Sequence, residues 1–208
     1  MDLDQRRVKF ITGQVFRKAA FGSFHPLSIA RHGAVVDLCT QMGWFRDGDI
    51  AECPQAERST LELFHDANYL YALARVDRTQ TATREDREKY NLGTLECPVF
   101  EGLWNRAAAT VGGSVLAARL ALAGDVAFHP AGGTHHGRTD RAPGFCYFND
   151  PVFAILTLLN SGIRRVAYID FDAHHGDGVQ DAFAHDPRVL PISIHEANRW
   201  PFSGEVTD

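Results

Sequence analysis

Long apolar runs, clustered cysteines and dense basic patches are all missing from this chain of 208 residues. The longest apolar stretch covers residues 107–118 and includes two glycines, whereas a membrane-spanning helix needs about 20 apolar residues. Lysine and arginine total 21 against 26 acidic residues and are nowhere concentrated, which argues against a nucleic-acid-binding surface. We therefore expect a protein that neither spans a membrane nor binds nucleic acid.

The four cysteines also lack the spacing of a metal or redox motif. They stand at positions 39, 53, 97 and 146 without a CxxC pair, and Cys97 and Cys146 have apolar neighbours. The first seven residues lack the apolar core of a signal peptide. We expect buried, reduced thiols and a cytoplasmic location.

What the chain does contain is an alternation of helical and strand-like segments. Apolar spacing and end signals predict helices over residues 29–42, 59–64, 67–74, 98–122 and 150–160. Three of these carry a named start signal: a capping box at Ser59, a first-turn proline at Pro98, and Asp150-Pro151 at the start of the last helix. Short apolar runs predict strands at residues 8–12, 125–129, 166–170 and 189–195, and residues 166–170 are apolar enough to be covered on both faces. This alternation predicts a single α/β sandwich domain around a mostly parallel sheet.

Two motifs bring together four histidines and three aspartates. Residues 132–137 read GGTHHG, and residues 168–178 read YIDFDAHHGDG. Each follows a predicted strand, and ligands of parallel α/β folds bind beyond the carboxyl ends of the strands. We therefore expect these two distant segments to converge on one site.

The second motif supplies two candidate metal ligands, Asp172 and His174. Their shared parity places both side chains on one side of an extended backbone. One carboxylate oxygen and one imidazole nitrogen suit Zn²⁺ or Fe²⁺. A catalytic zinc usually takes three protein ligands, and the motifs do not assign the third.

The first motif supplies a candidate pair of proton carriers, His135 and His136. Neighbouring residues of a regular strand face opposite ways, so the flanking glycines must form an irregular loop if both histidines serve one substrate. Asp170 and Asp177 can each accept a hydrogen bond from an imidazole, which fixes its tautomer and raises its basicity. One histidine could take a proton from a water at the metal while the other stays protonated, or one could do both.

With these residues, the chain resembles the zinc-dependent histone deacetylase superfamily, most closely the bacterial acetoin-utilization deacetylases and the class I enzymes. The shared motifs lie at residues 25–31, 96–102, 132–136, 144–150 and 169–178. The resemblance implies an arginase-like, three-layer α/β/α fold. It also implies removal of acetyl groups from acetyl-lysine in a protein or peptide, or from a similar acetylated small amine.

The resemblance assigns roles residue by residue. Asp172 and His174 match two zinc ligands, and the histidine pair with its two aspartates matches the catalytic centre. The positions that match substrate contacts are Arg31, Glu96, Gly144, Phe145 and Trp200, although class I enzymes usually carry aspartate at the position of Glu96. The backbone oxygens that match a structural potassium site belong to Asp170, Asp172, His174, Ser193 and Ile194.

Two of the family's functional residues fall beyond Asp208 in its motif order: an aspartate that is the third zinc ligand and a tyrosine that polarises the acetyl carbonyl. We therefore expect residues 1–208 to be the N-terminal portion of a catalytic domain, active when its C-terminal portion is present. The alternative is a non-catalytic remnant, or a domain that binds metal or acetylated ligands. A binuclear manganese ureohydrolase ranks lower because it would want a carboxylate where this chain has Gly176. The sequence leaves the oligomeric state open.

Overall fold

All the strand pairings of the described residues are parallel. The computed structural model describes residues 7–18, 20–22 and 25–205. Strand β1 (Val8–Thr12) lies between β2 (Ile50–Glu52) and β3 (Val126–Phe128), and β4 (Val166–Asp170) pairs with β5 (Val189–Ser193). The parallel α/β architecture expected from the sequence is confirmed, with the described strands in two sheets.

The register of the second sheet places two functional segments side by side. Val166 pairs with Val189 at one end and Asp170 with Ser193 at the other. Because the strands are parallel, the chain leaves both at the same edge. The segments that begin at residues 171 and 194 therefore start as neighbours.

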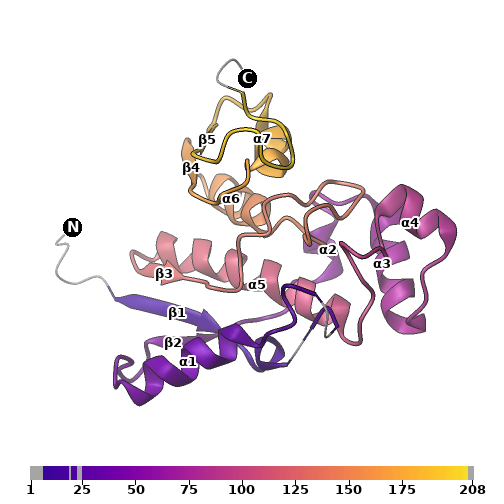
Figure 1. Ribbon diagram of the computed structural model, residues 1–208. Helices are drawn as coiled ribbons and strands as arrows, with labels where there is room; N and C mark the ends of the chain where they lie inside the picture. Colours follow the sequence, from indigo (N-terminus) through magenta and orange to yellow (C-terminus); the bar gives the residue numbers. More distant parts are fainter. Residues whose placement is uncertain (1–6, 19, 23–24, 206–208) are drawn as a thin grey trace.

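Two long helices connect the sheets. α5 (Leu103–Leu122) packs along α6 (Asp150–Asn160) and against β1 and β3. Both helices lie between the three-stranded and the two-stranded sheet (Figure 1). The close packing of α5 depends on glycine, since a Cβ at Gly112 would lie 1.9 Å from the Pro54 carbonyl oxygen.

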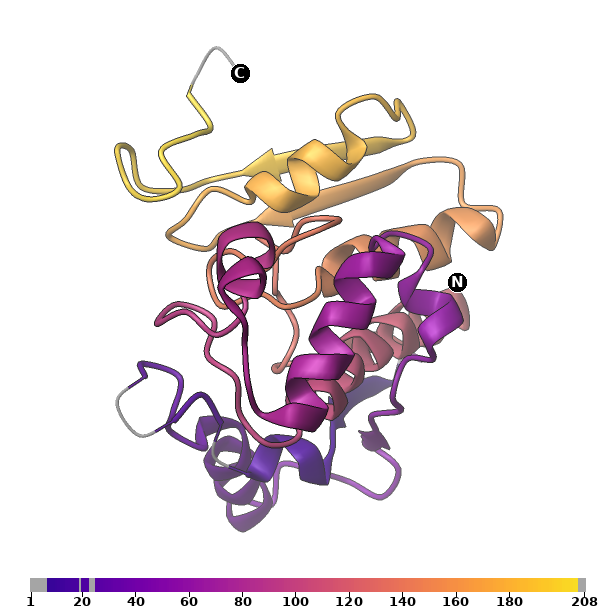
Figure 2. The same ribbon diagram turned by 90° about the vertical axis from the view of Figure 1, so that its right-hand side faces the viewer.

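The remaining helices are shorter than α5. Viewed from the side, α3 (Ala67–Thr79) runs in front of α5, with α4 (Arg84–Tyr90) beside it (Figure 2). The others are α1 (Arg31–Gln41), α2 (Arg58–Leu61), α7 (Asp177–Phe183) and the 3-10 turn η2 (Gln14–Arg17). No described helix is long and apolar enough to cross a membrane.

The sheet β4–β5 is covered on one face. Val166, Val179 and Val189 pack with apolar side chains of α6 in one buried cluster. On the opposite face Ile169 is 53% exposed and Leu190 is 60% exposed. The expectation that residues 166–170 are covered on both faces is therefore wrong for the described residues.

Two predicted helix starts are also wrong. α5 begins at Leu103 and not at Pro98, because the chain turns through Gly102 at φ 79°, a left-handed conformation that glycine tolerates. α2 begins at Arg58, so Ser59 already lies inside the helix and makes no cap. A capping box does occur at the start of α4, where Thr83 and Asp86 bond each other reciprocally.

The expected burial of Cys97 and Cys146 is confirmed. Cys97 and Cys146 are buried, and the four cysteines form no disulfide. Burial raises the pKa of both buried thiols, so they stay protonated.

Candidate functional site

The segment with His135 and His136 is an irregular loop after β3, held by the start of α6. The Asn149 side chain donates to the carbonyls of His135, at 3.1 Å, and Gly137, at 2.9 Å. The Asp150 carboxylate accepts from the amides of Thr134, at 2.7 Å, and Gly133, at 3.1 Å. These contacts give the loop the irregular shape that the adjacent histidines require.

Each histidine of the pair has its own carboxylate. The His135 Nδ1–H donates to Asp170 Oδ2 at 2.6 Å, and the His136 Nδ1–H donates to Asp177 Oδ1 at 2.6 Å. The two ring centroids are 3.9 Å apart, and all four side chains are buried. A hydrogen bond from Nδ1 leaves Nε2 of each ring free for other chemistry.

The two imidazoles differ in proton affinity. Burial lowers the pKa of His135, but the hydrogen bond and charge of Asp170, with the charges of Asp172 and Asp177, outweigh it and raise the pKa. For His136, burial is joined by the charges of His135 and His174, and the pKa falls despite Asp177. His136 is therefore the imidazole that more readily stays neutral, with a lone pair able to accept a proton, and His135 is the imidazole that more readily carries charge.

Asp172 and His174 follow β4 and face the histidine pair. Asp172 Oδ1 accepts from both the backbone amide and the Nδ1–H of His174, each at 2.8 Å. The same oxygen lies 3.9 Å from His135 Nε2. A carboxylate and an imidazole so close suit a divalent cation in donor type. Within the described ranges, no group of three His, Cys, Asp or Glu side chains is arranged to hold a metal ion.

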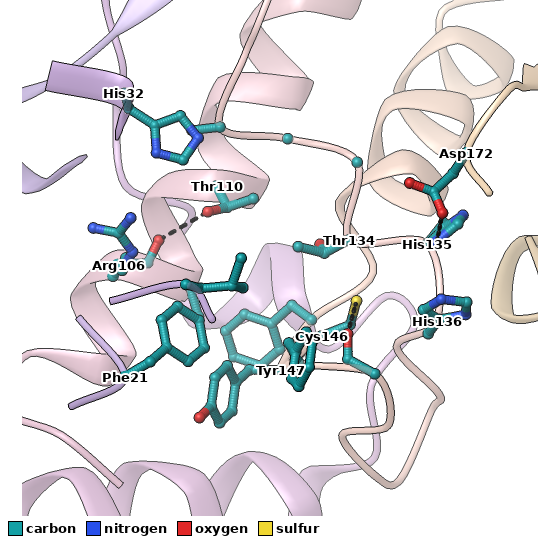
Figure 3. Close-up of a pocket in the computed structure, with 18 of the residues that line it drawn as sticks. Phe21, His32, Arg106, Thr110, Thr134, His135, His136, Cys146, Tyr147 and Asp172 are labelled. Carbon is teal, nitrogen blue, oxygen red and sulfur yellow. Dashed lines mark hydrogen bonds and ion pairs between the residues drawn. The ribbon is translucent and has the colours of Figure 1, made fainter. Parts of the chain in front are cut away.

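These side chains open on a cavity of about 570 Å³. In Figure 3, Asp172 and the two histidines lie at one end and His32 and Arg106 at the other. Arg31, the first residue of α1, also lines the cavity.

Gly144, Phe145 and Trp200 line the wall near the histidines. The Trp200 ring centroid is 4.7 Å from that of His136. A Cβ at Gly144 would lie 2.5 Å from the His136 ring and 2.7 Å from Trp200, so glycine is required there. Phe145 has φ 67°, a left-handed conformation that costs free energy for a residue with a Cβ.

Glu96 also lines the cavity and bonds to this wall. Its carboxylate accepts from the Gly144 amide at 2.9 Å and from the Asn91 side chain at 2.5 Å. The structure thus brings the residues matched to substrate contacts around one cavity. Their substrate contacts stay predictions.

The loop that carries Trp200 is tied back to the site by two further histidines. The His195 Nε2–H donates to the Gly204 carbonyl at 3.0 Å, and His175 Nδ1 is 2.9 Å from Ser203 Oγ. Nearby, Asp170 pairs with Ser193, and the Ile194 amide donates to the Asp170 carbonyl at 2.9 Å. Three of the backbone positions matched to a potassium site, Asp170, Ser193 and Ile194, are therefore neighbours, and potassium binding stays a prediction.

Several residues that hold the histidine pair in place were not assigned from the sequence. Asn149 and Asp150 lie in one of the motifs, but they hold the histidine loop through hydrogen bonds to residues 12 to 17 positions away in sequence. Tyr168 donates its hydroxyl to Asp170 at 2.6 Å, and Arg138 contacts Asp177 at 2.5 Å. The ionised form of Asp170 is favoured: burial raises its pKa, but the bonds from His135 and Tyr168 bring it down to about 2.

His65 supports the site from inside the core. Its Nε2 accepts from the Asn149 amide at 3.3 Å, and the side chain is buried. Burial lowers the pKa of His65 to about 4.

We expect His65 to make stability depend on pH. Between its ordinary pKa near 6.5 and its folded pKa of about 4, the unfolded chain binds a proton that the folded chain does not. The free energy of unfolding should therefore fall as pH decreases through this window, by up to about 1.4 kcal/mol per pH unit from this group. Urea unfolding at about pH 7 and about pH 5 measures the change. The variant His65→Gln should show a smaller decrease, and an equal decrease in both proteins would contradict the assignment.

The chain is similar in sequence to known proteins. Residues 25–208 match the model of the histone deacetylase domain. The chain is 39% identical over 198 residues to the acetoin utilization protein AcuC of Bacillus subtilis, covering 94% of this chain and 51% of that protein. It is 37% identical to the histone deacetylase RPD3 of Saccharomyces cerevisiae, covering 99% of this chain and 48% of the yeast protein.

The fold agrees as well. A solved histone deacetylase homologue from Aquifex aeolicus superposes with a TM-score of 0.92 at 36% identity, covering 97% of this chain and 55% of the homologue. The chain thus spans about half the length of these relatives. A domain match over most of its residues, with two such relatives and a superposable fold, shows that the chain belongs to the histone deacetylase family.

Proposed function

We propose that this chain carries the acid–base part of a metal-dependent site that hydrolyses the amide of acetyl-lysine or of a similar acetylated amine. One observation carries the proposal. Two buried Asp–His pairs, from segments about 35 to 41 residues apart in sequence, face Asp172 and His174 across the end of one cavity. Membership of a family of deacetylase-type hydrolases supports the same reaction.

His136 is the proposed base. Its Nδ1–H is engaged by Asp177, so a neutral His136 has its lone pair at Nε2. The lowered pKa keeps the ring neutral near pH 7. Nε2 takes a proton from the attacking water as the new C–O bond forms, and it returns that proton to the amine nitrogen as the C–N bond breaks. General acid–base catalysis of this kind contributes roughly 10²–10⁴-fold.

His135 is proposed to act as a cation. The charges of Asp170 and Asp172 favour its protonated form. A protonated Nε2 donates a hydrogen bond toward negative charge that develops on the substrate oxygen. The two adjacent histidines thus divide the work because their surroundings push their pKa values apart.

Asp172 and His174 are the residues that would hold a zinc ion, or Fe²⁺ in its place. When bound, such an ion polarises the substrate carbonyl and lowers the pKa of a coordinated water. The residues that we propose to receive the acetylated alkyl stem are Gly144, Phe145 and Trp200. Their apolar surface beside His136 suits a methylene chain and leaves the amide next to the proton carriers.

An acetate-release assay tests the proposal. The full-length protein is incubated with acetyl-lysine peptides and, separately, with acetylated polyamines, with and without added zinc, and free acetate is measured by NMR. Zinc-dependent release that a chelator stops is the expected result. No release from any acetylated amine at saturating zinc would overturn the proposed reaction.

A further inference from the structure

The Asp177 carboxylate has a different partner on each oxygen. Oδ1 accepts from His136 Nδ1 at 2.6 Å and from the Gly178 amide at 2.8 Å. Oδ2 accepts from Arg138 Nη2 at 2.5 Å. Arg138, which follows the two histidines in the same loop, therefore bonds the Asp177 oxygen that His136 does not use.

Among the residues that the structure describes, no such cation contacts the carboxylate of the other Asp–His pair. Asp170 Oδ2 accepts from His135 and from the Tyr168 hydroxyl, and Oδ1 accepts from the Asp172 amide at 3.0 Å. Both of the additional donors are neutral. In both pairs an imidazole donates a hydrogen bond to a carboxylate. The pairs differ in the other side-chain donor to that carboxylate, which is a charged guanidinium for Asp177 and a neutral hydroxyl for Asp170.

Arg138 also ties the histidine loop to α7. Its Nη1 donates to the Asp181 carboxylate, one helical turn after Asp177, and lies 3.5 Å from the Asp177 carbonyl oxygen. The helix start lies directly against the loop, since a Cβ at Gly178 would be 2.4 Å from the His135 carbonyl oxygen. The guanidinium thus spans the junction between the base and the element that supplies its carboxylate.

We propose that Arg138 is a positioning residue for the proposed hydrolysis, because it fixes the orientation of Asp177 and so the tautomer and the direction of His136. The torsion that turns a carboxylate about its Cβ–Cγ bond is broad, and one hydrogen-bonded oxygen leaves it free to swing. A charge-assisted bond to the second oxygen removes that freedom. This inference rests on the proposed role of His136 as base.

Steady-state kinetics test the inference in three variants. Arg138→Gln removes the positive charge. Arg138→Lys keeps a positive charge but loses the two-pronged guanidinium that contacts Asp177 and Asp181 together. The control, Arg84→Gln, removes an exposed arginine that pairs with Glu88. Loss of a residue that orients a catalytic group typically costs roughly 10–100-fold. We expect a kcat loss of that size in Arg138→Gln with KM nearly unchanged, a smaller loss in Arg138→Lys, and wild-type values in Arg84→Gln.

Nitrogen NMR of the histidine rings gives a readout that does not depend on turnover. Wild-type His136 should carry its proton on Nδ1, and Arg138→Gln should show a mixture of tautomers at the same pH. A folded Arg138→Gln with wild-type kcat and wild-type His136 signals would overturn the inference. If that variant does not fold, Arg138→Lys decides, and wild-type behaviour in both readouts would again overturn it. Absence of turnover in the wild type would instead remove the proposed function, while the NMR result would still decide the role of Arg138.

Discussion

In the complete protein, deacetylation should disappear when His136 is replaced by alanine. The variant loses the imidazole whose Nε2 is placed to take the water proton, and the expected loss in kcat is roughly 10²–10⁴-fold. Zinc should stay bound, because the proposed metal donors are Asp172 and His174. Turnover of an acetyl-lysine peptide and the zinc content of the same sample measure the two effects.

A matched histidine provides the control. His185 is exposed, lies just after α7 and does not line the cavity. His185→Ala should keep wild-type turnover and wild-type zinc. Retained turnover in His136→Ala would rule out this side chain as the base, and loss of zinc would mean that it holds the metal as well.

Zinc binding should be lost when Asp172 is replaced by alanine. The change removes one of two adjacent donors, and His174 also loses its hydrogen-bond partner. Elemental analysis after dialysis against zinc-free buffer should give zinc at the level of a chelator-treated sample. The exposed Asp47 is a suitable control, and Asp47→Ala should retain the metal. Full zinc occupancy in Asp172→Ala would contradict the ligand assignment.

The motifs predicted the centre of the candidate site better than its surroundings. The glycines around His135 and His136 indicated an irregular loop, and the shared parity of Asp172 and His174 after an apolar strand indicated that both side chains lie on one side of the chain. Both features are local in sequence. The loop is held in place by Asn149 and Asp150, and nothing in the spacing of these residues shows which carbonyls and amides they reach.

Helix ends show the same limit. The strand at Val8–Thr12 and the helix at Asp150–Asn160 follow from periodicity and a proline in the first turn. Pro98 carries the same signal, yet its carbonyl accepts from the Tyr147 hydroxyl and the chain makes a turn at Gly102 before α5 begins. Tertiary contacts and backbone sterics decided the start of that helix. Helix α7, only seven residues long, gave no periodic pattern and was not predicted.

The uncovered face of β4–β5 is another feature that periodicity could not show. Residues 166–170 are almost all apolar, a pattern typical of strands buried on both sides. In the described chain α6 and α7 cover one side, and Ile169 and Leu190 remain largely exposed on the other. The apolar composition of residues 166–170 indicated that this strand tends to be buried. It could not show whether another helix or strand covers each face of the strand.

Anomalous diffraction at the zinc edge, from crystals grown with zinc, tests the central claim most directly. We predict one peak within about 2.0–2.2 Å of a carboxylate oxygen of Asp172 and a ring nitrogen of His174, on the side that faces His135 and His136. A peak bound elsewhere, or no peak at saturating zinc, would contradict the assignment of this cavity as a metal-dependent hydrolytic site.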